Sequence, residues 1–489
     1  MAFPARPAPD DVPGSGPAFE IRYLDGTTTT SPLRDRDRAG RPGYRPRLAE
    51  REGIQTSRLL AALSTALDLT EGQLAGHAVR TCYLAMRVAA DMGFDDETLA
   101  DLFYAAMLKD AGCSSNAAAV TRIFGGDDIA LKGRQSTTGR GILDYAAFTI
   151  RNLPSTEPLP LRLRRLIRIG LAGRREHHLV EQLRCERGAE IARKAGFGDQ
   201  VGEAIHDLHE HWDGRGQPRG LARDRIHPLA RILAACQGLD IFRATRGRAV
   251  AQRVLRERSG TWYDPDVAGR LLALLDAGLF DELAAPDLVG RTMALEPERL
   301  VRVSDDDDLD RIASAFADIV DAKSPLTASH SQRVAGYCWA LADHLGLPAA
   351  AAADVRRAGL LHDLGKLGVP NAILDKPAAL SDAEYEQIKR HPELTLQILS
   401  PVAQLAGVAE MAACHHERLD GRGYFRGLAA PSLAIGARIV AVADVYEALI
   451  ADRPYRAAMP EEQAIAILDE ETGGHLAHDV VAALKVIVS

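Results

Sequence analysis

Histidines and aspartates recur in the last third of the sequence in a pattern that could bind metal ions. His362 and Asp363 are adjacent, and His415 and His416 are adjacent too. Imidazole and carboxylate ligands without a thiolate suit iron, manganese, zinc or a similar ion in a reactive site, rather than a structural zinc. The candidate ligands are His330, His362, Asp363, His391, His415, His416 and Asp444.

These ligands outnumber what one ion with an open coordination position needs. Adjacent residues on a helix point about 100° apart, so His362 and Asp363 suit two neighbouring ions better than one. The same holds for His415 and His416. A two-metal centre activates a water molecule and clamps a phosphate oxygen during in-line displacement. The pattern therefore predicts two divalent transition-metal ions, with iron or manganese foremost.

Lys366 follows His362 by four residues and Asp363 by three. On a continuing helix, all three would share one face. An ammonium group beside metal ligands repels the cations unless an anion lies between them, and a substrate phosphate would serve. The competing interpretation is a solvated lysine favoured by the dipole of a helix end.

A second copy of the pattern lies earlier in the chain. His77 precedes Lys109 by 32 residues, as His330 precedes His362, and "HEHWDGRGQPRGL" at 209–221 parallels "HERLDGRGYFRGL" at 416–428. Such a match predicts an internal repeat.

The first copy keeps only part of the ligand set. Its retained residues are His77, Asp110 and His209, and its replacements are Lys109, Cys185, Leu208 and Gln237. A protonated lysine cannot ligate a metal and repels it. We therefore expect the first copy to be degenerate and metal-free.

The length of 489 residues is too great for one ordinary core. Aromatic residues are scarce at 5%, and the helical periodicity predicts an all-α fold of two helical bundles in tandem. The glycine-rich segment 125–141 is expected to be flexible. The expected divisions are a disordered tail (1–52), a first domain (53–280) with an insertion near 114–175, a linker (281–309) and a second domain (310–489).

Composition also argues against some functions. A net charge of −8 is unlike the basic footprint of a nucleic-acid-binding protein. We expect no membrane span, because no apolar run is long enough. The six cysteines are scattered without CxxC spacing, which is typical of a reducing compartment. The expected location is the cytoplasm.

Five blocks of the second copy together resemble the HD-GYP domain, the phosphodiesterase branch of the HD superfamily. The resemblance spans roughly 310–489, and its blocks are "SPLTASHSQRV", "HDLGKLGVPNAIL", "IKRHPELT", "HHERLDGRGYFRGL" and "ARIVAVADVYEALIADRPYR". It implies two HD-type helical bundles, the first degenerate. It also implies hydrolysis of the 3′,5′-phosphodiester of cyclic di-GMP to pGpG or GMP.

The resemblance also implies residue roles. The seven candidate ligands would bind the metals, Asp363 would bridge them, and Asp363 and Lys366 would be catalytic. Lys366, Arg453 and Arg456 would contact the cyclic dinucleotide.

The sequence departs from the family at two places. The Gly-Tyr-Pro motif reads Gly423-Tyr424-Phe425, and Leu326 stands where some members carry a third-metal glutamate. The altered loop leaves open a regulatory protein with weak turnover, a protein partner bound through the loop or the N-terminal half, and a homodimer. Another substrate, such as 3′3′-cGAMP, also stays open.

Overall fold

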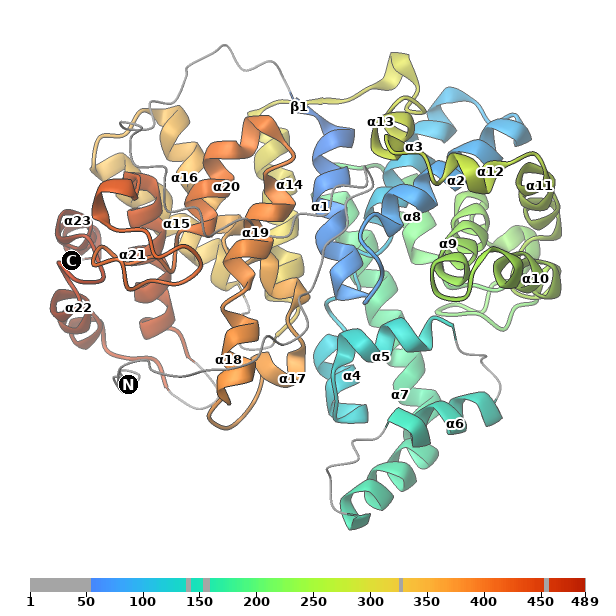
Figure 1. Cartoon of the computed structure of the whole chain (residues 1–489), viewed down its shortest axis with the longest axis horizontal. Coiled ribbons are helices and arrows are strands. Elements are labelled where there is room, and N and C mark those ends of the chain that lie inside the picture. The colour runs from blue at the N-terminus through green and yellow to red at the C-terminus, as the bar shows by residue number, and fades with distance from the viewer. Residues whose placement is uncertain (1–53, 138–141, 153–158, 325–328, 453–456, 489) are drawn as a thin grey trace.

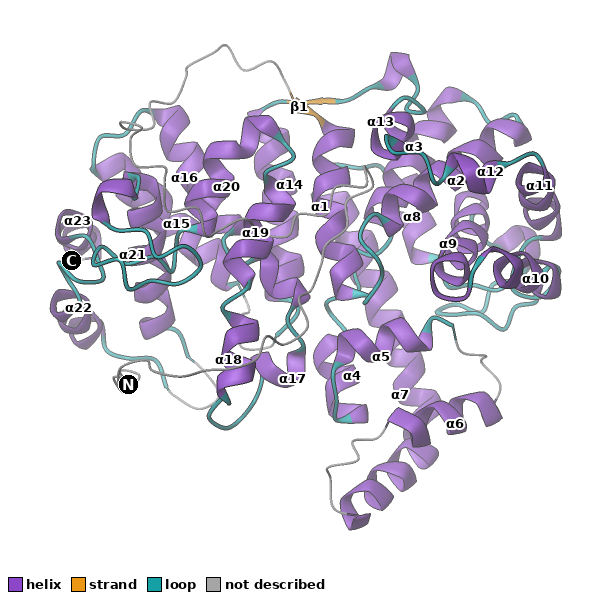
Figure 2. Ribbon diagram, in the orientation of Figure 1, coloured by secondary structure: helices purple, strands orange, loops and turns teal. Residues whose placement is uncertain are grey.

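The computed structural model describes residues 54–137, 142–152, 159–324, 329–452 and 457–488. The expected disordered tail, and the predicted substrate contacts Arg453 and Arg456, lie outside these residues. Figure 2 shows that the regular secondary structure of the described residues is almost all helix, which confirms the predicted all-α fold. Among the described residues, no helix is long and apolar enough to cross a membrane.

The first half contains thirteen of the described α-helices. They are α1 (Thr56–Thr70), α2 (His77–Met92), α3 (Asp96–Leu108), α4 (Ala117–Phe124), α5 (Asp128–Gln135), α6 (Ile142–Asn152), α7 (Leu159–Lys194), α8 (Asp199–His206), α9 (Pro228–Arg246), α10 (Arg248–Arg258), α11 (Pro265–Asp276), α12 (Leu279–Glu282) and α13 (Leu288–Met293), with 3₁₀ turns η1 (Arg223–Arg225) and η2 (Glu298–Leu300).

The second half repeats the arrangement without the insertion. Its helices are α14 (Asp306–Asp321), α15 (His330–His344), α16 (Ala349–Leu361), α17 (Asn371–Leu374), α18 (Asp382–Ile388), α19 (His391–Leu399), α20 (Ala406–Ala413), α21 (Ile435–Ile450), α22 (Glu461–Glu470) and α23 (His478–Val488), with 3₁₀ turns η3 (Leu364–Gly368), η4 (Ala403–Leu405) and η5 (Ala430–Ser432).

Equivalent elements of the two halves begin at equivalent residues, which confirms the tandem repeat. His77 opens α2 and His330 opens α15, while Lys109 caps the C-terminus of α3 as His362 caps that of α16. The loops of the two "DGRG" motifs are closed by matching backbone bridges, Asp213 to Ala222 and Asp420 to Ala429.

The two halves share one hydrophobic core. Helix α1 of the first half packs against η3 and α19 of the second, and α14 of the second packs against α7 of the first (Figure 1). Two short strands, β1 (Ile54–Gln55) and β2 (Val303–Ser304), also pair antiparallel across the junction.

The region expected to be a linker, 281–309, contains structured and partly buried elements. It includes α13, η2 and β2, and Leu288 and Thr292 are fully buried in it. The Tyr104 hydroxyl donates to the carboxylate of Glu296, which ties this segment to α3.

The insertion is helical rather than flexible over most of its described length. Residues 128–135 form α5, so the prediction of a flexible segment is wrong there. The Asp127 side chain caps the helix by accepting a hydrogen bond from the Ala130 N–H at 3.0 Å. Figure 1 shows α6 and the start of α7 projecting away from both halves, with α4 and α5 held against the body.

Asp68, near the end of α1, should make stability depend on pH. It is fully buried, accepts a hydrogen bond from the Ala78 N–H at 3.1 Å, and has one oxygen without a partner among the described residues. Burial raises its pKa to about 7. The folded state therefore holds this proton more tightly than the unfolded state, and stability falls as pH rises from about 4 to about 7.

Asp68→Asn removes the buried charge while keeping the acceptor. It should stabilise the chain at pH 8 by about 2–4 kcal/mol, at roughly 1.4 kcal/mol per unit of pKa, and have little effect at pH 4. Urea unfolding at both pH values measures this, with the exposed Asp276→Asn as control. Equal effects of Asp68→Asn at both pH values would contradict it.

Candidate metal centre

The structure brings all seven predicted ligands together. Most of them stand at helix ends, where a side chain can point along the helix axis into the space between helices. They are His330 at the start of α15, His362 and Asp363 just after α16, His391 at the start of α19, His415 and His416 after α20, and Asp444 within α21.

Backbone carbonyls fix the orientation of three imidazole rings. In each ring, Nδ1 lies close to the carbonyl oxygen three residues earlier, at 2.8 Å for His362, 2.8 Å for His391 and 2.6 Å for His415. A carbonyl only accepts, so Nδ1 carries the proton in each ring. Each Nε2 lone pair is then directed into the centre, as in metal-ligating histidines.

Asp363 lies between two groups of histidines. Its Oδ2 is 3.3 Å from Nε2 of His362 and 3.8 Å from Nε2 of His330. Its Oδ1 is 3.4 Å from Nε2 of His391 and 3.8 Å from Nε2 of His415. One carboxylate thus presents one oxygen to each group, as a ligand bridging two ions must.

The first group consists of His330, His362 and Asp444, whose ligand atoms lie within 4.8 Å of one another. Asp444 Oδ1 is 3.2 Å from His330 Nε2 and 3.8 Å from His362 Nε2. This group has the mixed imidazole and carboxylate character expected of a catalytic metal site.

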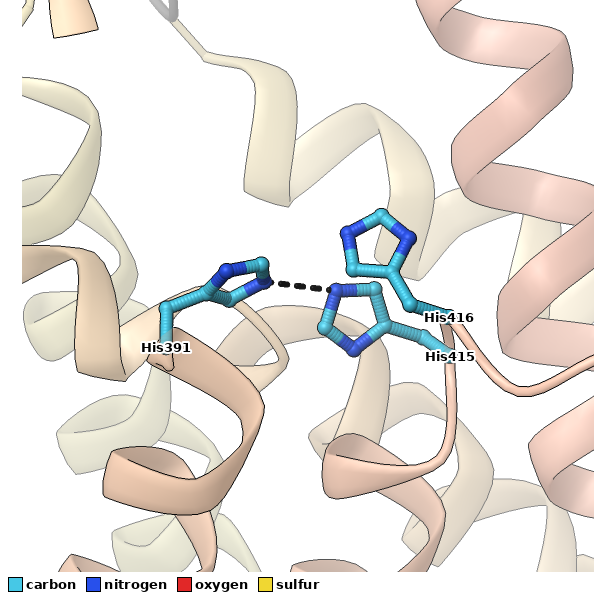
Figure 3. A group of neighbouring side chains, drawn as sticks. All are labelled: His391, His415 and His416. Carbon is cyan, nitrogen blue, oxygen red and sulfur yellow. Dashed lines mark hydrogen bonds between the residues drawn. The ribbon is translucent and has the colours of Figure 1, made fainter. Parts of the chain in front are cut away.

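The second group consists of His391, His415 and His416 (Figure 3), whose ligand atoms also lie within 4.8 Å of one another. The Nε2 atoms of His391 and His415 are 3.0 Å apart. Burial lowers the pKa of His391 and His416 well below normal and that of His415 to about 4. At neutral pH, two facing lone pairs at this distance repel each other unless a cation lies between them.

Two buried polar atoms of the centre without hydrogen-bond partners are consistent with a cation site. Nε2 of His362 and Oδ1 of Asp363 are buried and have no hydrogen-bond partner among the described residues. Burial by itself would raise the pKa of Asp363, but the charges of His362 and Lys366 outweigh it and hold that pKa well below its usual range. The carboxylate is therefore ionised and able to ligate.

Lys366 lies at the centre, but the backbone that places it there is not the continuing helix that was predicted. Helix α16 ends at Leu361, and the tighter 3₁₀ turn η3 follows Asp363, so the continuing helix is not present. The turn still places Lys366 Nζ 2.6 Å from Asp363 Oδ2. The Lys366 side chain is 25% exposed, whereas that of His362 is fully buried, so the lysine lies on the solvent side of the ligands.

Sequence reasoning missed Glu447. This buried carboxylate accepts a hydrogen bond from His330 Nδ1 and another from Arg333 Nε at 2.6 Å, which directs His330 Nε2 toward Asp444. The repeat contains the signal that could have found it. In the first half, Asp240 occupies the matching place and lies 2.8 Å from His77 Nδ1.

The centre of the first half contains side-chain cations in place of ligands. Asp110 is buried there, with Lys109 Nζ paired to its Oδ2 and Arg184 Nη2 3.4 Å from its Oδ1. Burial would raise the pKa of Asp110, but Lys109 and Arg184 lower it below its usual range. Each oxygen thus meets one fixed positive charge.

Arg184 corrects the sequence alignment of the repeat. Cys185 was predicted to stand opposite His391, but Arg184 contacts Asp110 Oδ1 at 3.4 Å just as His391 contacts Asp363 Oδ1 at 3.4 Å. Equal spacing gives the same match, because Arg184 precedes Leu208 by 24 residues, as His391 precedes His415. Arg184 also lies 3.1 Å from Glu71, so it forms part of a larger ion-pair network.

The Gly423-Tyr424-Phe425 loop lies over the second group of histidines. The rings of Tyr424 and His416 lie with their centroids 4.6 Å apart. Phe425 adopts a φ of +90°, which the fixed φ of proline cannot reach. The loop therefore has a backbone that the usual Gly-Tyr-Pro could not form at residue 425.

Lys109→Met should destabilise the chain without removing metal. It leaves the buried Asp110 carboxylate with one of its two cations, which we expect to cost about 3 kcal/mol. Urea unfolding and elemental analysis measure the two effects. The control is Lys485→Met, which removes an exposed pair with Asp469 and should cost under about 1 kcal/mol. Loss of metal from Lys109→Met would contradict the expectation that Lys109 has no part in metal binding.

Comparison with known proteins supports the fold and the repeat. The family model of the HD domain matches residues 171–267 and 314–480, one stretch in each half. A 3′3′-cGAMP-specific phosphodiesterase of Vibrio cholerae is 40% identical over 430 residues, covering 88% of this chain and 94% of that protein. A cyclic di-GMP phosphodiesterase of Thermotoga maritima is 38% identical over 161 residues, covering 32% and 43%.

A solved structure extends the similarity to both halves. The crystal structure of a cyclic GMP-AMP specific phosphodiesterase from V. cholerae matches with a TM-score of 0.62 and 35% identity, over 89% of this chain and 98% of that one. With a family model that matches both halves and a relative aligned over nearly its whole length, this chain belongs to the HD domain family of metal-dependent phosphohydrolases.

Proposed function

We propose that this chain is a two-metal phosphodiesterase that hydrolyses the cyclic dinucleotides cyclic di-GMP and 3′3′-cGAMP. The observation that carries the proposal is the position of Asp363, with one oxygen facing each of two histidine groups. The orphaned His362 Nε2 and Asp363 Oδ1 support it, because a buried ligand set of this kind needs cations.

Two divalent transition-metal ions would be held by the seven ligands, with Asp363 shared. When bound, such ions supply a nucleophilic water at neutral pH and stabilise the charge of the phosphoryl oxygens. Iron or manganese suits these nitrogen and oxygen ligands.

The protein side chains define where the phosphodiester would lie. The ligands His362, His391 and His415 are almost fully buried, so substrate reaches the centre from the side of Asp444 and Lys366, whose side chains are 16% and 25% exposed. On that side, Lys366 can donate a charge-assisted hydrogen bond to a non-bridging phosphate oxygen. Hydrolysis of the phosphodiester would give a linear dinucleotide such as pGpG, and a second round would give mononucleotides such as GMP.

Similarity to relatives supports two substrates. Cyclic di-GMP, the substrate that the sequence motifs indicate, is the one named for the T. maritima relative, which aligns over about a third of this chain. The relative that aligns over both halves is named for 3′3′-cGAMP. Since both halves contribute to the surroundings of the centre, we expect turnover of both substrates and faster turnover of 3′3′-cGAMP.

A side-by-side assay of anaerobically purified, metal-analysed protein tests this proposal. We expect about two metal ions per chain and hydrolysis of both cyclic dinucleotides, with no hydrolysis of mononucleotide phosphoesters. The assay also decides the alternative of a regulatory protein that acts through its Gly423-Tyr424-Phe425 loop. Full metal content with no turnover of either cyclic dinucleotide would establish that alternative.

Asp363 and Lys366 should differ in what their removal does. Asp363→Ala should abolish hydrolysis and deplete metal, because it removes the shared ligand. Lys366→Ala should keep the metal and lower turnover about tenfold or more, as expected for loss of one charge-assisted phosphate contact. Lys376→Ala removes a comparable lysine that pairs with Glu384 at 2.6 Å, and serves as the control. Metal loss from Lys366→Ala equal to that from Asp363→Ala would show that the lysine is structural.

A further inference from the structure

The turn that carries Lys366 lies at the junction of the two halves. Helix α1 of the first half packs on η3, and Leu69 of that helix approaches Gly368 at the end of the turn. Helix α4 of the insertion packs against α17, which begins three residues after η3. The first half therefore contacts the backbone turn that contains Lys366, the proposed catalytic lysine.

Asp128 makes a direct bond across this junction. It is the first residue of α5, is fully buried, and accepts a hydrogen bond at 2.8 Å from the backbone N–H of Asn371, which opens α17. A buried carboxylate that accepts a backbone N–H forms one of the stronger hydrogen bonds in proteins. Its other oxygen has no hydrogen-bond partner among the described residues.

Hydrogen bonds link Asn371 to η3 through Lys323. The Asn371 side-chain amide donates to the Lys323 carbonyl at 2.5 Å, and the buried Lys323 Nζ donates to the Leu367 carbonyl at 2.6 Å. At the other end of the turn, the Gly365 N–H donates to the Thr395 hydroxyl at 2.9 Å. The backbone on both sides of Lys366 is thus held by buried hydrogen bonds.

We propose that Asp128 of the degenerate half is a positioning residue for the reaction of the second half, because it fixes the 364–371 backbone that directs Lys366 toward the substrate phosphate. This inference rests on the proposed function for the role of Lys366. A displacement of about 1 Å in a group that contacts the reacting phosphate can lower a rate by up to about 100-fold.

The ion pairs of the degenerate centre hold α5 in the place where Asp128 can act. Lys132, one turn after Asp128, donates to the Cys113 carbonyl at 2.6 Å and lies 3.5 Å from Glu71. Glu71 in turn pairs at 3.1 Å with Arg184, the same arginine that contacts Asp110. The fixed cations of the first half therefore support the helix that contacts the catalytic turn.

Three variants of the full chain separate this role from general destabilisation. Asp128→Ala removes the bond to Asn371, whereas Asp128→Asn keeps an acceptor at the same place. Asp127→Ala removes the adjacent N-cap of the same helix, whose side-chain hydrogen bond, from the Ala130 N–H, lies within the first half. If Asp128→Ala does not fold, Asp128→Ser carries the same expectation, because its hydroxyl is one bond too short to reach Asn371.

Hydrogen exchange of segment 364–374, in metal-loaded protein without substrate, is the readout that does not depend on activity. Exchange should speed up at least about tenfold in Asp128→Ala and stay near wild type in Asp128→Asn and Asp127→Ala. Unchanged exchange in Asp128→Ala would overturn the proposal whether or not the chain proves to be a phosphodiesterase.

Kinetics then test whether Asp128 acts through Lys366. Asp128→Ala should keep its metal and lower kcat between about threefold and 100-fold, with recovery in Asp128→Asn. In a Lys366→Ala background, Asp128→Ala should have no further effect, because the group that it positions is already absent. Additive losses in the double variant, or an equal loss in Asp127→Ala, would refute the positioning role. Absence of hydrolysis by the wild-type chain would count against the proposed function. The hydrogen-exchange result would still test whether Asp128 fixes the 364–371 backbone.

Discussion

A buried carboxylate at the centre of each half is the feature on which the remaining structure depends. Asp110 and Asp363 are both nearly inaccessible, and an ionised carboxylate in such a place must be compensated by positive charge. The first half meets this need with Lys109 and Arg184, one for each oxygen. The second half surrounds the same carboxylate with imidazoles whose Nε2 atoms point inward and pairs it with Lys366, a set that metal cations would complete.

The arrangement of the helices is the same whether the carboxylate is compensated by side-chain cations or by metal ligands. His77 and His330 keep their places at the start of equivalent helices, and each has a carboxylate on its Nδ1, from Asp240 or Glu447. The change from one kind of centre to the other lies in a few side chains at helix ends. His362 corresponds to Lys109 and His391 to Arg184, so two ligands of one half are two cations of the other.

The sequence pointed to the seven candidate ligands that the structure brings together because they occur as a set at family spacing and because the repeat gave a second copy for comparison. It failed where geometry depends on tertiary contacts. The end of α16 has no glycine at the two positions after Leu361 where a helix usually stops, and η3 is fixed instead by buried bonds such as that of Gly365 to Thr395. The match of His391 was placed one residue away, at Cys185, although the equal spacing of 24 residues to Leu208 and to His415 gives Arg184. Helix α5 was missed because its flanking glycines suggested a loop, although Asp127 supplies its cap.

The two ways of compensating the buried carboxylate respond differently to metal concentration. This difference gives a physical reason for a chain to keep a degenerate copy. Lys109 and Arg184 are part of the polypeptide, so their pairing with Asp110 does not vary with the concentration of any ion. The network from Arg184 through Glu71 and Lys132 can therefore keep α5 in place before the second half has bound metal. A second centre of the catalytic kind would lose the charge of its ions whenever metal was scarce, and its support of the Lys366 turn would weaken. In the first half, side-chain cations take the place of ions. The helices that the first half contributes around the metal centre of the second half therefore keep their positions whether or not that centre has bound its ions.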